Sequence, residues 1–251
     1  MDRFDAITLI EMDGVKLQDR VDTKYVLAQQ ALPEILEAML KDYRILEVDG
    51  VRGTQYRSLY YDTQDLKNYH DHHNRRTFRS KIRFREYLGS GLAFLEVKRK
   101  TGRGRTDKKR LKVPGIPEAL KPEHVDFIRR ARGVEGELVP TLWNHFTRYT
   151  FVNRHRPERL TMDVGMRFAD ANGREELNGV VVAELKQERA DRTSCFVRIM
   201  RSKGLRPSGM SKYCIGMLML RKPVKYNAFK DVLLKLDGLR RTKALKPLIV
   251  G

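Results

Sequence analysis

The segment 77–87 alternates charged and apolar side chains with a period of two residues. Its odd positions carry cations and its even positions include large apolar groups: Arg79, Lys81, Arg83 and Arg85 against Phe78, Ile82 and Phe84. Because successive side chains of a β-strand point to opposite faces, this pattern predicts a strand with one cationic and one apolar face. This part of the chain is therefore restricted to a sheet that buries one face and gathers positive charge on the other.

Seven further segments show the same alternation, or an enrichment in β-branched and aromatic residues, and are also predicted as strands. The eight predicted strands are 20–27, 54–62, 77–87, 92–101, 105–113, 143–153, 159–168 and 180–187. Helices are predicted at 33–40, 122–132 and 192–203, and an amphipathic helix at 227–245 that packs on its own domain. Glycine pairs at 89–91 and 102–104 predict hairpin turns.

Charged residues share one strand face on five of the other segments as well. These sets are Arg20, Asp22 and Lys24; Glu96, Lys98 and Lys100; Arg159 and Asp163; Glu184 and Lys186; and Arg57, opposite Tyr56 and Tyr60. For any one strand, an ordinary sheet with a solvated charged face and a buried apolar face is the favoured explanation. Repetition over six strands favours a concave or closed sheet lined with cations, since like charges on neighbouring strands repel unless an anion lies between them.

The overall charge agrees with such an anionic ligand. The chain has 51 Lys and Arg against 32 Asp and Glu, which gives a formal net charge of +19. A polyanion is the expected partner: nucleic acid, a membrane surface or a phosphate-rich small molecule. Within a cationic sheet, a chain of phosphates fits best, because Arg offers bidentate contacts and Lys offers point charges.

Three carboxylates fall within the basic pattern, namely Glu184, Glu96 and Asp163. Each could hold Mn²⁺ or Mg²⁺ between its own oxygens and phosphate oxygens, which is how these hard cations commonly bind. A salt bridge to a neighbouring Lys or Arg is the alternative for each of them. The cluster His70, His72 and His73 is expected in a solvated loop rather than in a metal site.

Other classes of protein are disfavoured. Two cysteines, Cys195 and Cys214, are too few for a disulfide framework or a thiolate zinc site and suit a reducing cytoplasm. The sequence has no apolar run of 18 residues, no signal-peptide core at its N-terminus and no P-loop motif. A cytoplasmic location is expected. Docking to a membrane-protein partner and the oligomeric state are left open.

Eight fragments occur in an order that resembles a known family: DRVDTKYVL, RSLYYDT, KIRFREY, FLEVKRK, TRYTFVN, RLTMDVGM, VVAELK and SKYCIGM, from about Asp19 to Met217. They resemble the catalytic domain of the vacuolar transporter chaperone polyphosphate polymerases, in its short bacterial form. That domain belongs to the triphosphate tunnel metalloenzymes, which are relatives of the CYTH phosphatases. The resemblance implies an α+β fold in which eight antiparallel strands close into a cationic barrel, with helices outside. It implies a catalytic domain at 1–225, followed by the helix at 226–251.

Single residues follow from the matched motifs. Arg83 and Arg85 match the family's phosphate-binding Arg-x-Arg pair, and Glu184 in AELK matches its metal-binding glutamate. The expected catalytic residues are Arg83, Arg85, Lys98 and Arg148. With strand parity added, the expected substrate-binding residues are Lys24, Arg57, Lys81, Lys100, Arg110, Arg159, Lys186 and Lys212. Lys108, Arg110 and Lys112 share a face of strand 105–113, whose register is left open.

The resemblance implies a polyphosphate polymerase that transfers the γ-phosphate of ATP to a growing inorganic polyphosphate chain, with Mn²⁺ or Mg²⁺. The Glu-x-Glu-x-Lys signature of CYTH phosphatases is replaced by RVDTK at 20–24, which weighs against a hydrolase. A tunnel triphosphatase and a non-catalytic module that binds polyphosphate or nucleic acid are the alternatives. Nucleic acid is not expected as the primary ligand, because most aromatic residues are expected opposite the cationic face.

Overall fold

The eight predicted strands are all present in the computed structural model, which describes residues 1–13, 20–102, 106–132, 136–221 and 225–245. They are β2 (Val21–Ala28), β4 (Gly53–Asp62), β5 (Arg79–Leu88), β6 (Leu92–Lys100), β7 (Thr106–Val113), β8 (Val139–Asn153), β9 (Glu158–Asp170) and β11 (Val180–Gln187). Three short strands were not predicted: β1 (Ala6–Ile7), β3 (Tyr43–Leu46) and β10 (Gly173–Leu177). Most of the turn predicted at 102–104 lies outside the described residues.

Four helices match the predictions and three do not. The predicted ones are α2 (Leu32–Met39), α4 (Pro122–Arg132), α5 (Cys195–Ser202) and α7 (Lys230–Leu245), with the short 3₁₀ turns η1 (Gln29–Ala31) and η2 (Asn227–Phe229). The others are α1 (Leu9–Asp13), α3 (Lys67–His73) and α6 (Lys212–Arg221). The prediction of a loop around His70 is therefore wrong, because this segment forms α3. The last part of the predicted segment 226–251, residues 246–251, lies outside the described residues.

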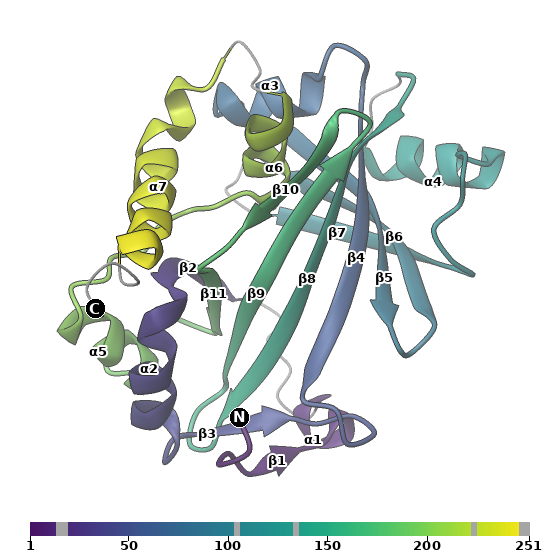
Figure 1. Cartoon of the computed structure of the whole chain (residues 1–251). Helices are drawn as coiled ribbons and strands as arrows, with labels where there is room; N and C mark the ends of the chain where they lie inside the picture. The colour runs from purple at the N-terminus through teal and green to yellow at the C-terminus, as the bar shows by residue number, and fades with distance from the viewer. Residues whose placement is uncertain (14–19, 103–105, 133–135, 222–224, 246–251) are drawn as a thin grey trace.

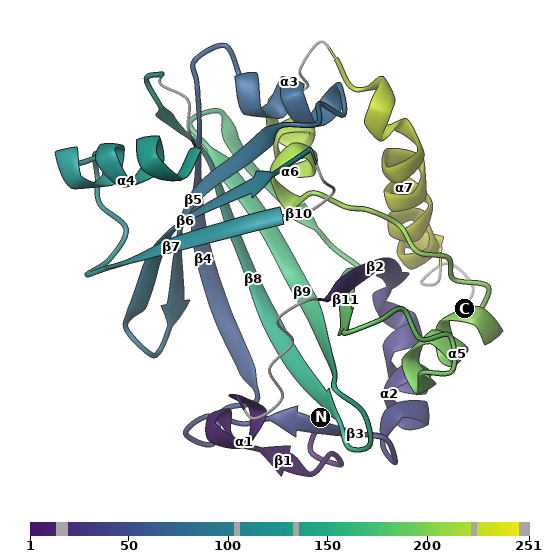
Figure 2. The ribbon, with the colours of Figure 1, turned by 180° about the vertical axis from the view of Figure 1, so that it is seen from behind.

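The strands form one curved sheet. Its hydrogen-bonded order is β2-β11-β9-β8-β4-β5-β6-β7, with antiparallel pairing throughout this path. Strands β5 to β7 lie across β8 and β9, so that the sheet encloses a concave face (Figures 1 and 2). Within the described residues, β2 and β7 are the two ends of this path and do not pair. The expectation of a closed barrel is therefore not confirmed: the structure has a deeply curved, open antiparallel sheet.

Helices cover the apolar side of the strands, which is the convex side. On one part of it, Tyr25, Val181 and Leu185 pack with Ile35 of α2 and Phe196 of α5. On another part, α4 covers a second cluster, made up of Ile82, Phe84, Leu95, Val97 and Ile128. Since the alternating strands bury these faces outside the curve, their charged side chains must point into it.

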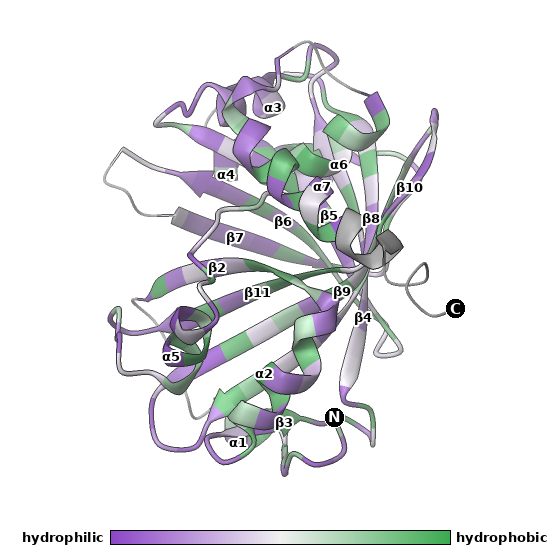
Figure 3. Ribbon diagram, turned by 60° about the vertical axis from the view of Figure 1, so that its left-hand side comes forward, coloured by the Kyte–Doolittle hydropathy of each residue, from purple (hydrophilic) through white to green (hydrophobic). Residues whose placement is uncertain are grey.

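One end of the concave face is filled by apolar groups rather than charges. Helix α6 packs there against β8 and β9, and Leu236 of α7 joins the same cluster. Figure 3 shows that α6 is largely hydrophobic and that strand β7 is largely hydrophilic. This packing closes one end of the concave space and leaves a cationic region beyond it. None of the described helices combines the length and apolarity needed to cross a membrane.

Candidate active site

A cavity of about 220 Å³ lies on the concave face and is lined almost entirely by charged side chains. Its lining consists of Arg20, Asp22, Lys24, Tyr60, Lys81, Arg83, Arg85, Glu96, Lys98, Lys108, Arg148, Glu184, Lys186, Met210, Ser211 and Lys212. Ten of these residues are Lys or Arg and three are Asp or Glu. An excess of this size in a concave, partly desolvated space focuses a strong positive potential.

Strand register places these groups in rows across the sheet. Lys81 on β5 is paired with Lys98 on β6, which is paired in turn with Lys108 on β7. In the next row, Arg83 lies beside Glu96. Paired residues of antiparallel strands project from the same face, so each row brings two or three charges within a few ångströms. The pairing also settles the register of β7: Lys108 is the residue of this strand that reaches the cavity.

Three carboxylates, of which Glu96 and Asp163 are buried and Glu184 is half-buried, each bind two cations. Glu96 accepts two hydrogen bonds from the Arg83 guanidinium, at 2.6 and 2.9 Å, and forms an ion pair with the Lys108 ammonium at 2.5 Å. The same arrangement recurs twice: Asp163 contacts Arg148 at 2.6 Å and Lys212 at 2.5 Å, and Glu184 contacts Lys24 at 2.8 Å and Lys186 at 2.9 Å. The carboxylates thus act as spacers that hold cations apart along the cavity wall.

Three cations of the lining lack such a partner. Among the described residues, Lys81, Arg85 and Lys98 have no carboxylate within 4.0 Å. Arg85 is 6% exposed and makes one side-chain hydrogen bond, from its Nε to Ser58 Oγ at 3.3 Å. A buried charge without a counter-ion is costly, so these three groups are the ones that an anionic ligand would relieve most.

The pKa values of several lining residues are shifted by burial and by the excess of positive charge in the cavity. Burial, together with Arg83, lowers the pKa of Arg85 to about 10. Burial also lowers the pKa of Lys108 to about 8, against the opposing effect of Glu96. Although burial alone would raise it, the pKa of Glu96 is held well below its usual range by Arg83, Arg85 and Lys108. Glu96 is thus ionised at neutral pH, and the lowered pKa of Lys108 means that its ammonium group loses its proton more readily than usual.

Aromatic rings lie beneath several of these cations. The Arg85 guanidinium carbon lies 5.0 Å from the ring centroid of Tyr56, and that of Arg148 lies 5.4 Å from Phe146. Tyr60 accepts a hydrogen bond from Arg83 at 3.0 Å. The expectation that most aromatic residues take the opposite face is wrong for this part of the sheet. The rings are buried and support the cations from below.

Helix α6 brings Lys212 to the cavity from outside the sheet. The helix lies so close to β8 and β9 that a Cβ atom at Gly216 would come within 2.6 Å of Leu142 and Phe168. This approach sets the first turn of α6 over the concave face, where the Lys212 ammonium lies 4.7 Å from the Phe146 ring centroid. The absence of a side chain at Gly216 therefore allows α6 to approach the sheet closely enough to place Lys212 at the cavity.

The structure places most of the predicted site residues together. The cavity lining contains Lys24, Lys81, Arg83, Arg85, Glu96, Lys98, Arg148, Glu184, Lys186 and Lys212, and Asp163 lies directly behind Arg148. Their roles stay predictions. Tyr60, Met210 and Ser211 were not predicted; the two last precede α6, and strand parity carries no signal for them.

Four predicted substrate-binding residues do not line the cavity. Arg57 is on the other face of β4, where it binds Glu86. Lys100 lies beyond Lys98 at the end of β6, and Arg110 is exposed with its guanidinium carbon 5.3 Å from the Phe94 centroid. Arg159 on β9 is the direct partner of Lys186 on β11. Its guanidinium donates a hydrogen bond to the Met12 carbonyl at 3.3 Å.

The carboxylates of the cavity supply only part of a coordination sphere for a metal. Within the described part of the chain, no three His, Cys, Asp or Glu side chains come together to hold an ion. Glu184 is the carboxylate best placed for a shared role, because Asp22 lies beside it: the Lys186 ammonium is 2.9 Å from Glu184 and 3.7 Å from Asp22. These residues fit Mg²⁺ or Mn²⁺ only if phosphate oxygens complete the coordination, which is a common arrangement for both ions.

The fold and site define a protein with a curved antiparallel sheet, whose concave face carries a cationic cavity and ion-paired carboxylates. The family comparison is more specific: residues 19–221 match the VTC domain model, so the chain belongs to the VTC domain family. Among curated proteins, none matches the sequence at a significant level.

Solved structures are similar to this chain at low sequence identity. A Hippeastrum protein, provisionally named an adenylyl cyclase and described as having a dominant triphosphatase activity, has a TM-score of 0.51. It is 17% identical, and the match covers 83% of this chain and all of that one. Proteins provisionally named adenylate cyclases from Bacillus halodurans and Vibrio parahaemolyticus have TM-scores of 0.48 and 0.45, at 11% and 14% identity. These matches cover 77% and 80% of this chain and 94% and 99% of the others.

Proposed function

We propose that this chain is a metal-dependent polyphosphate polymerase that transfers the γ-phosphate of ATP to a growing inorganic polyphosphate chain in the cationic cavity. The observation that supports it most is the set Lys81, Arg85 and Lys98, three lining cations with no carboxylate partner in the described chain. A triphosphate supplies the missing negative charge in a row, as does a polyphosphate chain. Membership of the VTC domain family favours the same class of substrate.

Phosphoryl transfer needs positioning and charge stabilisation more than covalent help from the protein. Arg83, Arg85, Lys98 and Arg148 would bind the oxygens of the phosphate chain, with Lys81 and Lys212 alongside them. The carboxylates Glu96 and Asp163 hold two of these arginines in fixed orientations, so the donors are set before the ligand arrives.

A metal held between Glu184 and phosphate oxygens would offset charge at the transferred group. This carboxylate faces the cavity from β11 and lies against two ammonium groups, those of Lys24 and Lys186. Either of them can turn to the phosphates once the carboxylate binds an ion. We keep Mn²⁺ and Mg²⁺ as equal candidates.

Transfer to a phosphate fits the site better than hydrolysis. A hydrolase needs a base with a pKa near neutrality to activate water, whereas a terminal phosphate acceptor is already ionised. The pKa values of Glu96 and Glu184 are held well below their usual range against the effect of burial, by Arg83 and by Lys186 respectively, among other cations. Lys108, with a pKa near 8, is mostly protonated at neutral pH and pairs with Glu96.

A tunnel triphosphatase is the second candidate, and the triphosphatase activity described for the Hippeastrum protein favours it. Nucleic acid is a poorer candidate, because the rings that could stack on bases, Tyr56 and Phe146, are buried beneath cations. Since ATP is the proposed donor, we also propose a cytoplasmic location. Docking to a membrane-protein partner stays a prediction.

The purified protein incubated with ATP and Mn²⁺ tests both candidates on a polyphosphate gel. A ladder of long chains supports the polymerase, and free phosphate without a ladder identifies a triphosphatase. Lys108→Ala and Lys109→Ala form a matched pair, because Lys108 lines the cavity and Lys109 projects from the exposed opposite face of β7. We expect activity to fall at least tenfold in Lys108→Ala and to persist in Lys109→Ala. Equal activity in the two variants would contradict the assignment of the cavity.

A further inference from the structure

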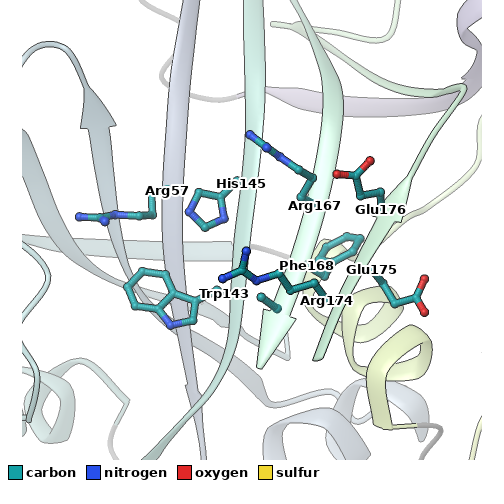
Figure 4. A pocket seen from close by; sticks show the side chains of 9 residues that line it. Arg57, Trp143, His145, Arg167, Phe168, Arg174, Glu175 and Glu176 are labelled. Carbon is teal, nitrogen blue, oxygen red and sulfur yellow. The ribbon is translucent and has the colours of Figure 1, made fainter. Parts of the chain in front are cut away.

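A second hollow, of about 470 Å³, lies on the convex face of the sheet, on the far side of β8 from the cationic cavity. We call it the outer-face site; it is lined by Arg57, Trp143, His145, Arg167, Phe168, Ala169, Arg174, Glu175 and Glu176. Figure 4 shows these side chains, which project from the neighbouring strands β4, β8, β9 and β10. Nothing in the proposed reaction uses this surface.

The strand register builds the outer-face site from two rows. In one row, Arg57 on β4, His145 on β8 and Arg167 on β9 are direct neighbours. In the other, Trp143 on β8 is paired with Ala169 on β9, which is paired with Arg174 on β10. The small Ala169 side chain between two large neighbours leaves the hollow. Because its walls stand on hydrogen-bonded strands, the donors are held in place without a ligand.

The aromatic wall is fixed by its neighbours. The Arg57 guanidinium carbon lies 5.6 Å from the ring centroid of Trp143, and His145 stacks on the same indole with centroids 6.2 Å apart. Arg57 is already bound to Glu86 at 2.5 Å. This arginine therefore anchors the indole and is not the group left for a ligand.

Two other arginines are left for a ligand. Arg167 and Arg174 are exposed, and no carboxylate of the described chain lies within 4.0 Å of either. In Figure 4, Glu175 and Glu176 lie along the edge of the hollow away from Trp143. Burial and the three guanidiniums of the site lower the pKa of His145. The potential at the imidazole is therefore positive.

We propose that the outer-face site binds a small phosphoanion, with Arg167 and Arg174 holding its oxygens and His145 donating from a ring nitrogen. Two guanidinium forks and an imidazole offer more donors than the two oxygens of one carboxylate can accept, whereas a phosphate group presents three or four oxygens. The phosphate can come from an inorganic anion or from a nucleotide. The inference does not depend on the reaction in the cavity.

Trp143 is the only tryptophan of the chain, so its fluorescence reports on this site alone. We would titrate the full-length protein separately with orthophosphate, pyrophosphate and ADP at an ionic strength held constant with KCl. We expect a saturable change in emission with at least one of them. Loss of a charge-assisted hydrogen bond weakens binding by about tenfold or more. The half-saturating concentration should rise by that factor in Arg167→Ala and in Arg174→Ala.

Two control variants separate this site from the rest of the molecule. Lys98→Ala removes a cation from the cavity and Arg198→Ala removes one from the exposed face of α5, and both should keep the response. An equal response to citrate would overturn the assignment to phosphate, and an unchanged titration in Arg174→Ala would overturn the site. If the emission stays constant, calorimetry decides: the double variant of Arg167 and Arg174 must lose one class of sites that the unaltered protein shows. Identical heats in the two proteins would refute the inference.

Discussion

Replacement of Glu96 by glutamine tests whether buried carboxylates hold the cavity wall together. The Glu96 side chain is 2% exposed and lies between Arg83, at 2.6 Å, and Lys108, at 2.5 Å. Glu96→Gln keeps the shape of the side chain but removes its charge. Two cations are then left facing each other in a space that already holds Lys81, Arg85 and Lys98.

Removing one partner of a buried ion pair typically costs about 3–5 kcal/mol, because the other charge stays buried without compensation. This is a large share of the total stability of a domain, which is about 5–15 kcal/mol. For a chain of this length each kcal/mol lowers the melting temperature by about 2–4 °C, so we expect a fall of roughly 6–20 °C. Circular dichroism or calorimetric melting at neutral pH measures it.

Glu86→Gln is the matched control. Glu86 pairs with Arg57 on the convex face, where the arginine side chain is 41% exposed, so its loss should cost no more than about 1 kcal/mol. Tripolyphosphate should restore part of the stability lost in Glu96→Gln, because its oxygens replace the missing carboxylate. At 100 times its dissociation constant, a ligand contributes about 2.7 kcal/mol. If both variants lowered the melting temperature by the same small amount, Glu96 would not be needed to hold the cations of the cavity wall together.

Three further predictions concern pH and packing. Because the pKa of Lys108 is lowered to about 8, substrate affinity measured by calorimetry should fall as the pH rises above 8, and Lys108→Ala should weaken this dependence. Although burial opposes it, Arg148 and Lys212 depress the pKa of Asp163, so its contribution to stability is present above the unfolded value near 4 and is lost as the pH falls below it. Acid melting curves should flatten below pH 4 in Asp163→Asn relative to the unaltered protein. Gly216→Ala should lower the melting temperature by roughly 2–12 °C, because the new methyl group costs about 1–3 kcal/mol against β8 and β9. An unchanged melting temperature would show that α6 shifts without cost.

Strand parity was the most reliable guide in the sequence. It assigned Lys81, Arg83 and Arg85 to one face of β5, and the structure brings all three to the cavity. The prediction succeeded because the other face of β5 carries Ile82 and Phe84, which leaves no doubt about the side that must be buried. Parity also pointed to Glu184, whereas Lys212 lies on a helix and was found only through a motif of the VTC family.

Parity failed where both faces of a strand have a reason to be buried. On β4, Tyr56 and Tyr60 point into the curve and Arg57 points outward, because the rings form the floor under Arg85 and Arg83. A sequence gives the alternation but not the side of the sheet that becomes concave. Arg110 shows a related limit: the register pairs it with Glu96, yet the ion pair is made by Lys108, the diagonal neighbour on the same face of β7.

The sequence by itself determined the eight long strands, the net charge of +19 and the separation of cationic from apolar faces, because each depends only on local order along the chain. The tertiary structure decided the rest. The curvature of the sheet determined which face lies inside, and the strand register determined which cations lie near the three carboxylates. Helix α6 brought Lys212 to Asp163, from which it is separated by 49 residues in the sequence. The open edge between β2 and β7 was also beyond the sequence, since parity describes a strand's faces and says nothing of its partners.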